Sequence, residues 1–307
     1  MGRYVARRLL LTIPVLIGAS FLIFWLVYAL PGDPIRALGG DRPLAPGVVA
    51  ALRDEYNLDD PLLVQYAKYV GGLLQGDFGT EFSGRPVIDT ITQRLPVTVR
   101  LALVAIGFEI VFGLIAGIMA GIRRGSFWDN LVLVSTTAVV SVPVFVLGFI
   151  AQYTLGLQLA LFPIAGIRDG WYSYLLPGLV LASLSLAYVA RLTRTSLAEN
   201  LRQDYVRTAR AKGLKQSVVV GKHTLRNSLI PVVTFIGADL GNLMAGAIVT
   251  ESVFNIPGLG RAVFDAVLRQ EGAVVVGIVT LFVFFYIFFN LVVDVLYAVI
   301  DPRIRYE

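Results

Sequence analysis

The segment Asp204-Tyr-Val-Arg-Thr-Ala-Arg-Ala-Lys-Gly213 is a polar stretch between the fourth and fifth apolar stretches of the chain, and the run His223-Thr-Leu-Arg-Asn-Ser-Leu-Ile-Pro231 follows it. Asp204 is a good helix N-cap, and the alanines within the segment favour helix. Gly213 can adopt the left-handed conformation that ends many helices. The segment therefore predicts a short basic helix with a sharp end, followed by a second helix that leads into a membrane span.

Two further residues mark the limits of these helices. Lys212 would lie at the negative C-terminal end of the first helix, where a cation is favourable. Ser217 is placed to cap the second helix, which continues through Leu225 and Leu229 to Pro231. We therefore expect the first helix to lie across the membrane surface between two spans.

The chain as a whole is strongly apolar. Of its 307 residues, 56% are hydrophobic and 15% are charged, and the mean hydropathy is +0.74. Soluble domains are usually about 45–50% apolar, so the composition indicates an integral membrane protein. The chain has no cysteine and a single histidine, His223, which excludes disulfides, thiolate sites and histidine-clustered metal centres. We expect no catalytic residues and no metal site in it.

Six apolar stretches are long enough to cross a bilayer as helices, which takes roughly 20 residues. They are 9–30, 97–122, 131–155, 174–192, 229–250 and 274–300. The first stretch exceeds the roughly 7–15 apolar residues of a signal-peptide core, so we expect it to remain as a helix. The expected organisation is an N-terminal membrane helix at 1–30, an extracytoplasmic loop at 31–94 and a five-helix core at 95–307.

Lysine and arginine residues are concentrated on one side of these spans. That side contains the N-terminal arginines, Arg123 and Arg124, the basic run at 191–226, and Arg303 with Arg305. Basic residues favour the cytoplasmic side, so both termini are predicted to be cytoplasmic. The same bias accounts for the sequence pI of about 9.5 without nucleic-acid binding.

The outer loop at 31–94 contains two apolar patterns with helical spacing. One pattern is Val48, Val49, Leu52 and Tyr56, and the other is Leu62, Tyr66, Tyr69 and Leu73. This spacing predicts two short helices over the outer mouth of the spans. We expect these helices to have a role, because ordered loops of this length are usually functional. The alternative is a solvated connection that has no role of its own.

The basic segment could bind a partner or only the membrane. Small side chains at Thr208, Ala209 and Ala211 would allow close approach by a partner, and Tyr205 offers a broad amphipathic contact surface. The alternative is that the charges orient the protein or contact anionic lipid, since each lysine or arginine near such a surface contributes about 1 kcal/mol. The charges alone do not distinguish these two roles.

The spacing of the segment resembles a motif in the permease subunits of ATP-binding-cassette (ABC) importers, in which Glu-Ala-Ala is followed by a glycine. Arg207-Thr208-Ala209 stands in the place of Glu-Ala-Ala, and Gly213 stands in the place of the glycine. The chain departs from this motif at Arg207, which replaces the acidic residue, and at Leu225-Arg226, which replaces a Leu-Pro pair.

These departures resemble the B-type permeases of dipeptide and oligopeptide importers, and the resemblance extends over the whole chain. It rests on Pro31-Gly-Asp-Pro34, the stretches at 205–213 and 225–231, Glu251-Ser-Val-Phe254 with Pro257-Gly-Leu-Gly260, and Asp301-Pro-Arg-Ile-Arg305. The resemblance implies an all-α membrane protein with the type I ABC importer permease fold. That fold would have six transmembrane helices and a long helical extracytoplasmic loop between the first two.

The resemblance also implies partners in a bacterial cell membrane. A second permease, by the family pattern a different C-type chain, would complete the pathway, and an extracytoplasmic binding protein would deliver the peptide. Two cytoplasmic ATPase subunits, or one fused ATPase, would bind ATP and magnesium. The chain itself binds no cofactor in this scheme, because it has no Gly-x-x-x-x-Gly-Lys-Ser/Thr phosphate-binding loop.

In this scheme the cytoplasmic loop at 193–228 contains the coupling helix, which docks on an ATPase subunit. The residues expected to form this coupling site are Asp204, Tyr205, Arg207, Thr208, Ala209, Ala211, Lys212 and Gly213.

Polar side chains within the spans are the candidates for the translocation pathway, since they are costly in lipid and usually face protein or water. They are Glu109, Gln152, Asp239 and Asn242, with Asn290 and Asp294 in the last span. We expect Asn290 and Asp294 to be structural. Asp239 is the best pathway candidate, because a carboxylate there could meet the ammonium group of a peptide. The alternative is that Asp239 pairs with a neighbouring helix.

Helix-breaking and small residues mark bends and close contacts. Pro143 is expected to kink the third span. Gly113, Gly117 and Gly121 form a stripe on the second span that favours close helix packing. Three glycines in the fifth span could ease bending at a gate or could serve packing; they are Gly237, Gly241 and Gly246.

The expected function is import of dipeptides or oligopeptides by alternating access, driven by ATP hydrolysis on the partners. Within the same family, nickel chelates or glutathione are the alternative cargo. An ion-coupled secondary transporter is the alternative of a different class, and it would leave the coupling segment unexplained.

Overall fold

The computed structural model describes residues 2–29, 45–55 and 57–300, and this part of the chain is helical apart from turns and one isolated bridge between Thr80 and Pro86. Four features predicted from the sequence lie outside the described residues. They are the Pro31–Pro34 and Asp301–Arg305 motifs, Tyr56, and the terminal arginines Arg303 and Arg305. The expected all-α fold class is confirmed for the described residues.

Five continuous helical spans are long and apolar enough to cross a membrane, and a bent pair of helices makes a sixth. The first and last single helices are α1 (Gly2–Tyr28) and α15 (Gly272–Ile300). The second span consists of α5 (Val87–Phe108), the π-helical η1 (Glu109–Gly113) and α6 (Leu114–Ile122). The fourth and fifth are α9 (Leu175–Asn200), preceded by the 3₁₀ turn η3 (Gly170–Tyr174), and α13 (Ile230–Val253).

The second span begins earlier than the sequence predicts. Its helix starts at Val87 instead of residue 97, because Pro86 stands immediately before it and Pro96 within it does not end it. Val87 and Ile91 are buried in an apolar cluster with residues of α14 (Leu259–Leu268) and α15. Tertiary packing therefore makes a helix of the final residues of the predicted outer loop.

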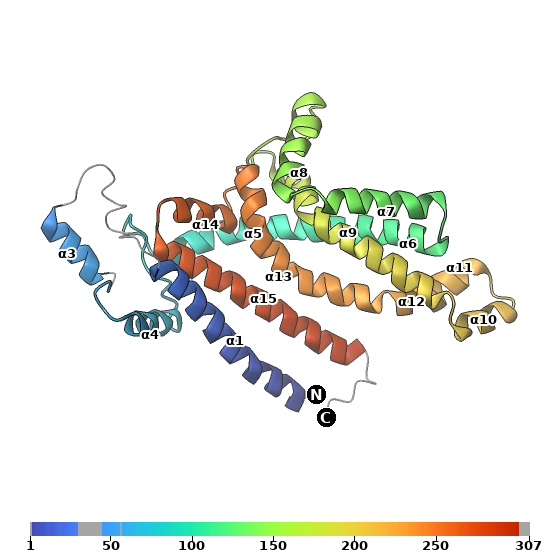
Figure 1. Ribbon diagram of the computed structural model, residues 1–307, viewed down its shortest axis with the longest axis horizontal. Helices are drawn as coiled ribbons and strands as arrows, with labels where there is room; N and C mark the ends of the chain where they lie inside the picture. The colour runs from blue at the N-terminus through green and yellow to red at the C-terminus, as the bar shows by residue number, and fades with distance from the viewer. Residues whose placement is uncertain (1, 30–44, 56, 301–307) are drawn as a thin grey trace.

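Pro143 has a larger effect than the kink expected from the sequence. α7 (Phe127–Val140) ends before it, and α8 (Val144–Ala151) begins directly after it and continues into the π-helical η2 (Gln152–Gln158). The two halves differ in direction by 104°. Proline lacks the N–H needed within a helix but suits a helix start, so here it ends one helix and starts another. Figure 1 shows α8 projecting away from the other spans.

The glycine stripe on the second span packs against α9, as predicted. A Cβ at Gly117 would lie 2.5 Å from the Cβ of Thr193, and one at Gly113 would lie 2.8 Å from a methyl group of Val189. Gly121 lies similarly close to Leu197. Because glycine has no side chain, the two helix backbones can approach closely at these positions.

The glycines of α13 lie mainly in packed contacts. A Cβ at Gly241 would lie 2.8 Å from the Cα of Tyr286, and one at Gly237 would lie 2.5 Å from a methyl group of Val293, both on α15. Gly246 has only an ordinary contact with Leu181. Close packing of α13 on α15 therefore accounts for the first two glycines.

The two helices predicted in the outer loop are confirmed. They are α3 (Pro46–Glu55) and α4 (Leu62–Leu73). α4 lies against α1, where Tyr66 packs on Phe21 and Phe24 and shares a 2.8 Å hydrogen bond with Ser20. Tyr69 also reaches α15, and burial raises the pKa of its phenol to about 12. The side chains of α4 therefore fix this helix onto two spans.

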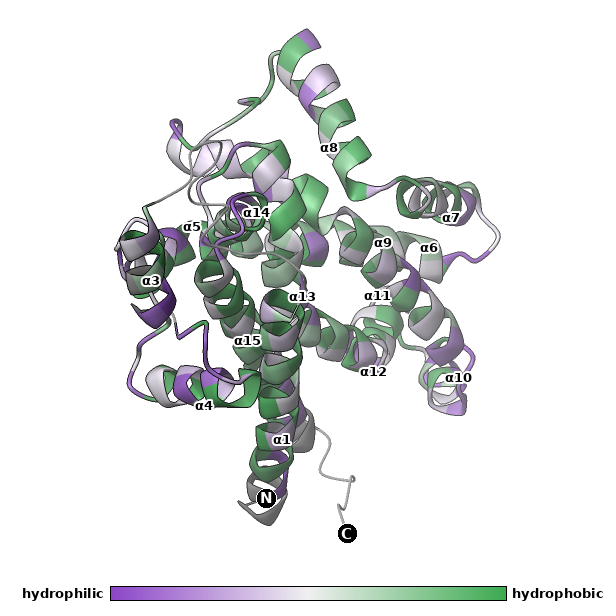
Figure 2. Ribbon diagram, turned by 60° about the vertical axis from the view of Figure 1, so that its left-hand side comes forward, coloured by the Kyte–Doolittle hydropathy of each residue, from purple (hydrophilic) through white to green (hydrophobic). Residues whose placement is uncertain are grey.

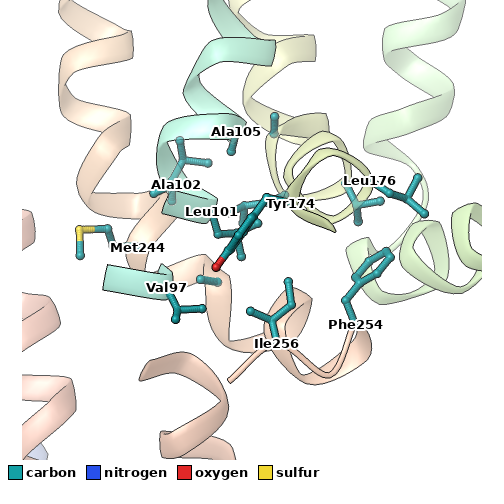
Figure 3. Close-up of a cluster of buried hydrophobic side chains, with 14 residues drawn as sticks. Val97, Leu101, Ala102, Ala105, Tyr174, Leu176, Met244, Phe254 and Ile256 are labelled. Carbon is teal, nitrogen blue, oxygen red and sulfur yellow. The ribbon is translucent and has the colours of Figure 1, made fainter. Parts of the chain in front are cut away.

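The hydrophobic core joins α5, α9 and α13 around Tyr174, as Figure 3 shows. Leu101 and Leu176 are 0% and 1% exposed, and Phe254 and Ile256 complete the cluster from the turn after α13. Because these side chains come from three spans, they bind the second, fourth and fifth spans into one body.

The Glu251–Gly260 segment folds as an anchor for α14. The Glu251 carboxylate is fully buried and accepts hydrogen bonds from Thr98 Oγ1 at 2.6 Å and from the backbone N–H of Arg261 at 2.9 Å. Carboxylates are stabilised at helix N-termini by the unpaired N–H groups there. A Cβ at Gly258 would lie 2.2 Å from the carboxylate, so only glycine fits. This geometry explains the first glycine of the Pro257-Gly-Leu-Gly260 stretch.

The polar helices lie at opposite ends of the spans. In Figure 1, α3 and α4 are at one end, and α10 (Asp204–Ala211) and α11 (Gln216–Val218) are at the other. In Figure 2, the long spans between them are coloured mainly as hydrophobic. The basic segment is therefore presented at the end opposite to the outer-loop helices.

Candidate functional site

The predicted basic helix is present as α10, with its first residue shifted by one position. Gln203 is the N-cap in extended conformation, and Asp204 is the first helical residue instead of the predicted cap. Asp204 still lies in the first turn, where an acidic side chain is favourable, and forms an exposed ion pair of 3.3 Å with Arg207. The prediction for Ser217 was also wrong, because Lys215 occupies the N-cap position of α11 and Ser217 lies inside that helix.

The C-terminal end of α10 matches the prediction closely. Gly213 has φ of +76°, in the left-handed region. Its N–H donates to Arg210 O at 2.9 Å, and the N–H of Leu214 donates to Ala209 O at 3.3 Å. This pair of hydrogen bonds is the Schellman motif, which satisfies carbonyl groups that a helix end otherwise leaves free.

One face of α10 is seated on the chain itself. Val206 and Ala209 form a buried cluster with Val219 of the π-helical η4 (Val219–Thr224), and Ala209 is only 7% exposed. Ala209 therefore supports the helix from below and is not on the free face where the sequence placed it. The free face carries Tyr205, Arg207, Thr208, Ala211 and Lys212, which are exposed.

The segment is connected to two spans through short rigid pieces. Tyr205 Oη donates to the side-chain oxygen of Asn200 at 2.9 Å, next to the end of α9. On the other side, η4 leads into α12 (Leu225–Ser228), which meets α13 almost at once. Ser228 Oγ donates to Thr224 O at 2.9 Å. Force applied to α10 can therefore reach α9 and α13 without crossing a long loop.

Glu109 and Asp239 are an unusual pair of acids within the spans. Glu109 is fully buried in η1, and neither of its carboxylate oxygens has a hydrogen-bond partner in the described part of the chain. Asp239 is 5% exposed; one oxygen accepts from Asn242 Nδ2 at 3.2 Å and the other has no partner there. Buried carboxylates in lipid require a cation, a proton or a donor, and π-helical turns are frequent at functional sites.

Gln152 differs from the other pathway candidates because its amide is bound by backbone carbonyl groups of other segments. Its Nε2 donates to Ile164 O at 2.8 Å and to Val253 O at 3.1 Å. The side chain thus ties η2 to the end of α13.

Of the two polar residues of α15 that were expected to be structural, Asp294 contacts a neighbouring helix, whereas Asn290 bonds within α15. Asp294 pairs with Arg8 of α1 at 3.3 Å, and the Asn290 amide donates to Tyr286 O at 2.8 Å. No group of three or more metal-ligating side chains lies together among the residues with described placement.

One structural ion pair was not identified from the sequence. Arg194 of α9 binds Asp129 of α7 through two hydrogen bonds, with Nε–Oδ1 at 2.5 Å and Nη2–Oδ2 at 2.9 Å. Asp129 also accepts from the backbone N–H of Gly125 at 2.7 Å. The local signal was Ser126 before Asp129, since serine as N-cap with an acid three residues later marks a helix start. The partner Arg194 is distant in sequence and could not be found that way.

Two family models match the chain. The model described as "Binding-protein-dependent transport system inner membrane component" covers residues 113–306, and the model for the N-terminal part of such membrane components covers residues 1–102. Together they include α10 and Asp239, whereas Glu109 lies in the short gap between the two matched regions.

Relatives with known names match over the full length. The glutathione transport system permease proteins GsiC of Escherichia coli K12 and Salmonella typhimurium LT2 are each 42% identical over 308 residues, covering 100% of both chains. Among solved structures, the MetNI methionine ABC transporter in an inward-facing conformation has a TM-score of 0.57 at 17% identity, covering 70% of this chain and 97% of that one. The latter similarity concerns the fold alone.

Proposed function

The chain belongs to the family of binding-protein-dependent transport system inner membrane components, the permease subunits of ABC importers, and we propose that it forms one half of an ATP-driven pathway for short peptides. It is a multi-pass bacterial membrane protein with the type I importer permease fold. Because the chain belongs to this family, the alternative of an ion-coupled carrier no longer applies. The chain is a membrane component, and its partners supply the catalysis.

The geometry of α10 is the observation that carries this proposal. A short helix with a closed C-terminal end presents an exposed face, while its buried face rests on η4. A rigid protrusion of this kind suits docking into a groove of a cytoplasmic ATPase subunit. ATP-driven closure of two such subunits would then move α9 and α13 and switch the pathway between inward-facing and outward-facing states.

The proposed complex has an asymmetric arrangement across the membrane. α10 faces the cytoplasm with both termini, and α3 and α4 face the extracytoplasmic binding protein. A second permease of different sequence completes the pathway, and ATP and magnesium bind to the ATPase subunits. The concentration of arginines near α10 supports this orientation.

Short peptides are the proposed cargo, and glutathione is the first to test because it is itself a tripeptide and named relatives transport it. No observation on this chain favours nickel chelates. Asp239 would recognise the ammonium group that free peptides and glutathione share, with Asn242 orienting Asp239. Glu109 is fully buried and would not contact the cargo directly.

The proposal can be tested with the complex assembled from its co-purifying subunits in proteoliposomes. ATP-dependent uptake of labelled glutathione or of a dipeptide, reduced by excess unlabelled cargo, is the expected result. Uptake that continues without ATP, or a chain that purifies with no ATPase subunit, would contradict it. Binding of nickel chelates in place of peptides would overturn the cargo while leaving ATP coupling in place.

A further inference from the structure

A basic pocket lies at the α10 end of the spans, between the turn that joins α6 to α7 and the last turns of α9. It has a volume of about 120 Å³ and is lined by Arg124, Arg194, Thr195, Ala198, Glu199 and Arg202. A water molecule needs roughly 10–15 Å³ of such space, so the pocket is large enough for a group several times the size of a water molecule. It is separate from the exposed face of α10.

The charges around the pocket favour an anion. Three arginines line it against one glutamate. Arg194 is held in place by Asp129, which uses both of its oxygens for that pair and for Gly125. Neither Arg124 nor Arg202 lies within ion-pair distance of a carboxylate in the described structure. Their guanidinium groups are therefore available to a ligand, and arginine matches phosphate oxygens especially well.

The position of the pocket corresponds to the headgroup level of a membrane. α6 ends at Ile122 and α7 begins at Phe127, so Arg124 lies within a few residues of two apolar spans. Phe127 and Trp128 are 71% and 51% exposed next to this turn and stack edge-to-face at 5.6 Å. Tryptophan and other aromatic side chains are typical of the membrane interface, and basic pockets between spans bind anionic headgroups.

We propose that this pocket binds the phosphate group of an anionic membrane lipid such as phosphatidylglycerol. Arg124 and Arg202 donate to the phosphate oxygens, Thr195 offers a hydroxyl, and the acyl chains lie beside Phe127 and Trp128. Arg202 is close to the start of α10. The lipid would therefore stabilise the end of α9 next to α10.

The test uses the full-length chain in its purified complex, with Arg124→Gln, Arg202→Gln and the double variant. Arg123→Gln is the matched control, because Arg123 lies in the same exposed turn but does not line the pocket. Phosphatidylglycerol retained through detergent purification is measured by native mass spectrometry after reconstitution in mixed phosphatidylcholine and phosphatidylglycerol. A hydrogen bond to a charged group contributes about 1.5–3 kcal/mol, so we expect retention to fall at least about tenfold for each pocket variant and further for both, and much less for Arg123→Gln.

Three results would overturn the proposal. Equal lipid loss in Arg123→Gln would mean that the charges act only as a diffuse field. Displacement of the lipid by millimolar inorganic phosphate or ATP would make a soluble anion the ligand. Loss of an ATPase subunit from the double variant, with lipid retention unchanged, would make the pocket a protein contact.

Discussion

Gly213 ends α10 through its backbone conformation. Its φ is +76°, and a Cβ there would meet no atom within 4 Å. The requirement for glycine is therefore conformational and not steric. We expect Gly213→Ala to destabilise the end of α10 by about 1–2 kcal/mol and to lower ATP-dependent uptake several-fold.

Gly213→Asn is the matched control, since asparagine tolerates the left-handed region better than alanine does. Uptake is measured with equal amounts of complex in proteoliposomes. If both variants transported at the wild-type rate, the closed end of α10 would not matter for coupling.

The pair Asp239 and Glu109 can be tested at the same scale. A charge-assisted hydrogen bond contributes about 1.5–3 kcal/mol, so Asp239→Asn should reduce uptake of a free peptide roughly 10- to 100-fold if the carboxylate meets its ammonium group. Glu109→Gln should have a smaller effect, because Glu109 has no exposed surface. A peptide with an acetylated amino group should lose nothing on either change. Equal losses for the free and acetylated peptides would exclude ammonium recognition.

Residue-level predictions from the sequence were right where the backbone alone decides them. The left-handed Gly213 follows from residue type. The burial of Ala209 on the inner face of α10 could not be predicted, because it depends on contact with Val219, which lies in a separate helical turn. The N-caps predicted at Asp204 and Ser217 were each displaced, since the helices begin after Gln203 and Lys215, whose side chains make no cap hydrogen bond. The tertiary fold fixes these two helix starts, and the local sequence signal does not show it.

At the scale of elements, the seating of α10 predicts two different effects from one type of substitution. Ala209→Leu places a larger side chain between Val206 and Val219, and overpacking of this kind typically costs about 1–3 kcal/mol. Ala211→Leu adds the same side chain on the exposed face. We expect Ala209→Leu to increase proteolytic cleavage within 204–224, measured by limited proteolysis of the full-length chain after its ATPase subunits have been removed, while Ala211→Leu leaves cleavage unchanged. Equal cleavage of both variants would contradict the packing of Ala209 against Val206 and Val219.

The anchor at Glu251 predicts the stability of α14. Glu251→Ala removes two hydrogen bonds to a buried carboxylate, each contributing about 1.5–3 kcal/mol, and should lower the thermal unfolding temperature of the detergent-solubilised complex. Glu251→Gln keeps the shape and one acceptor oxygen, so its effect should be smaller. An unfolding temperature unchanged in Glu251→Ala would show that the cluster of Thr98, Glu251 and Arg261 does not hold α14.

The elements themselves were largely predictable because long apolar runs and helical periodicity are local signals. The two outer-loop helices followed from the spacing of residues such as Leu62 and Tyr66. The break at Pro143 was underestimated as a kink, since the sequence does not show that the two halves diverge by 104°. The early start at Val87 likewise depends on packing against α14 and α15.

The whole molecule combines a packed body of spans with different polar helices at each end. Its second, fourth and fifth spans share one core, and α15 links α1 and α4 to that body. The permease family and the number of spans were predicted from the sequence. The ion pair of Arg194 with Asp129 was not, because it joins residues far apart in the chain.

The most direct test of the account is a cross-link from α10 to an ATPase subunit. The chain has no cysteine, so Thr208→Cys on the exposed face and Ser83→Cys in the exposed outer turn each give a single reactive site. After treatment of the assembled complex with a short bifunctional reagent, we expect Thr208→Cys to form an adduct with an ATPase subunit, in a yield that changes when ATP binds. Ser83→Cys should form none. An intact complex in which Thr208→Cys forms no such adduct would contradict the claim that α10 couples ATP hydrolysis to transport.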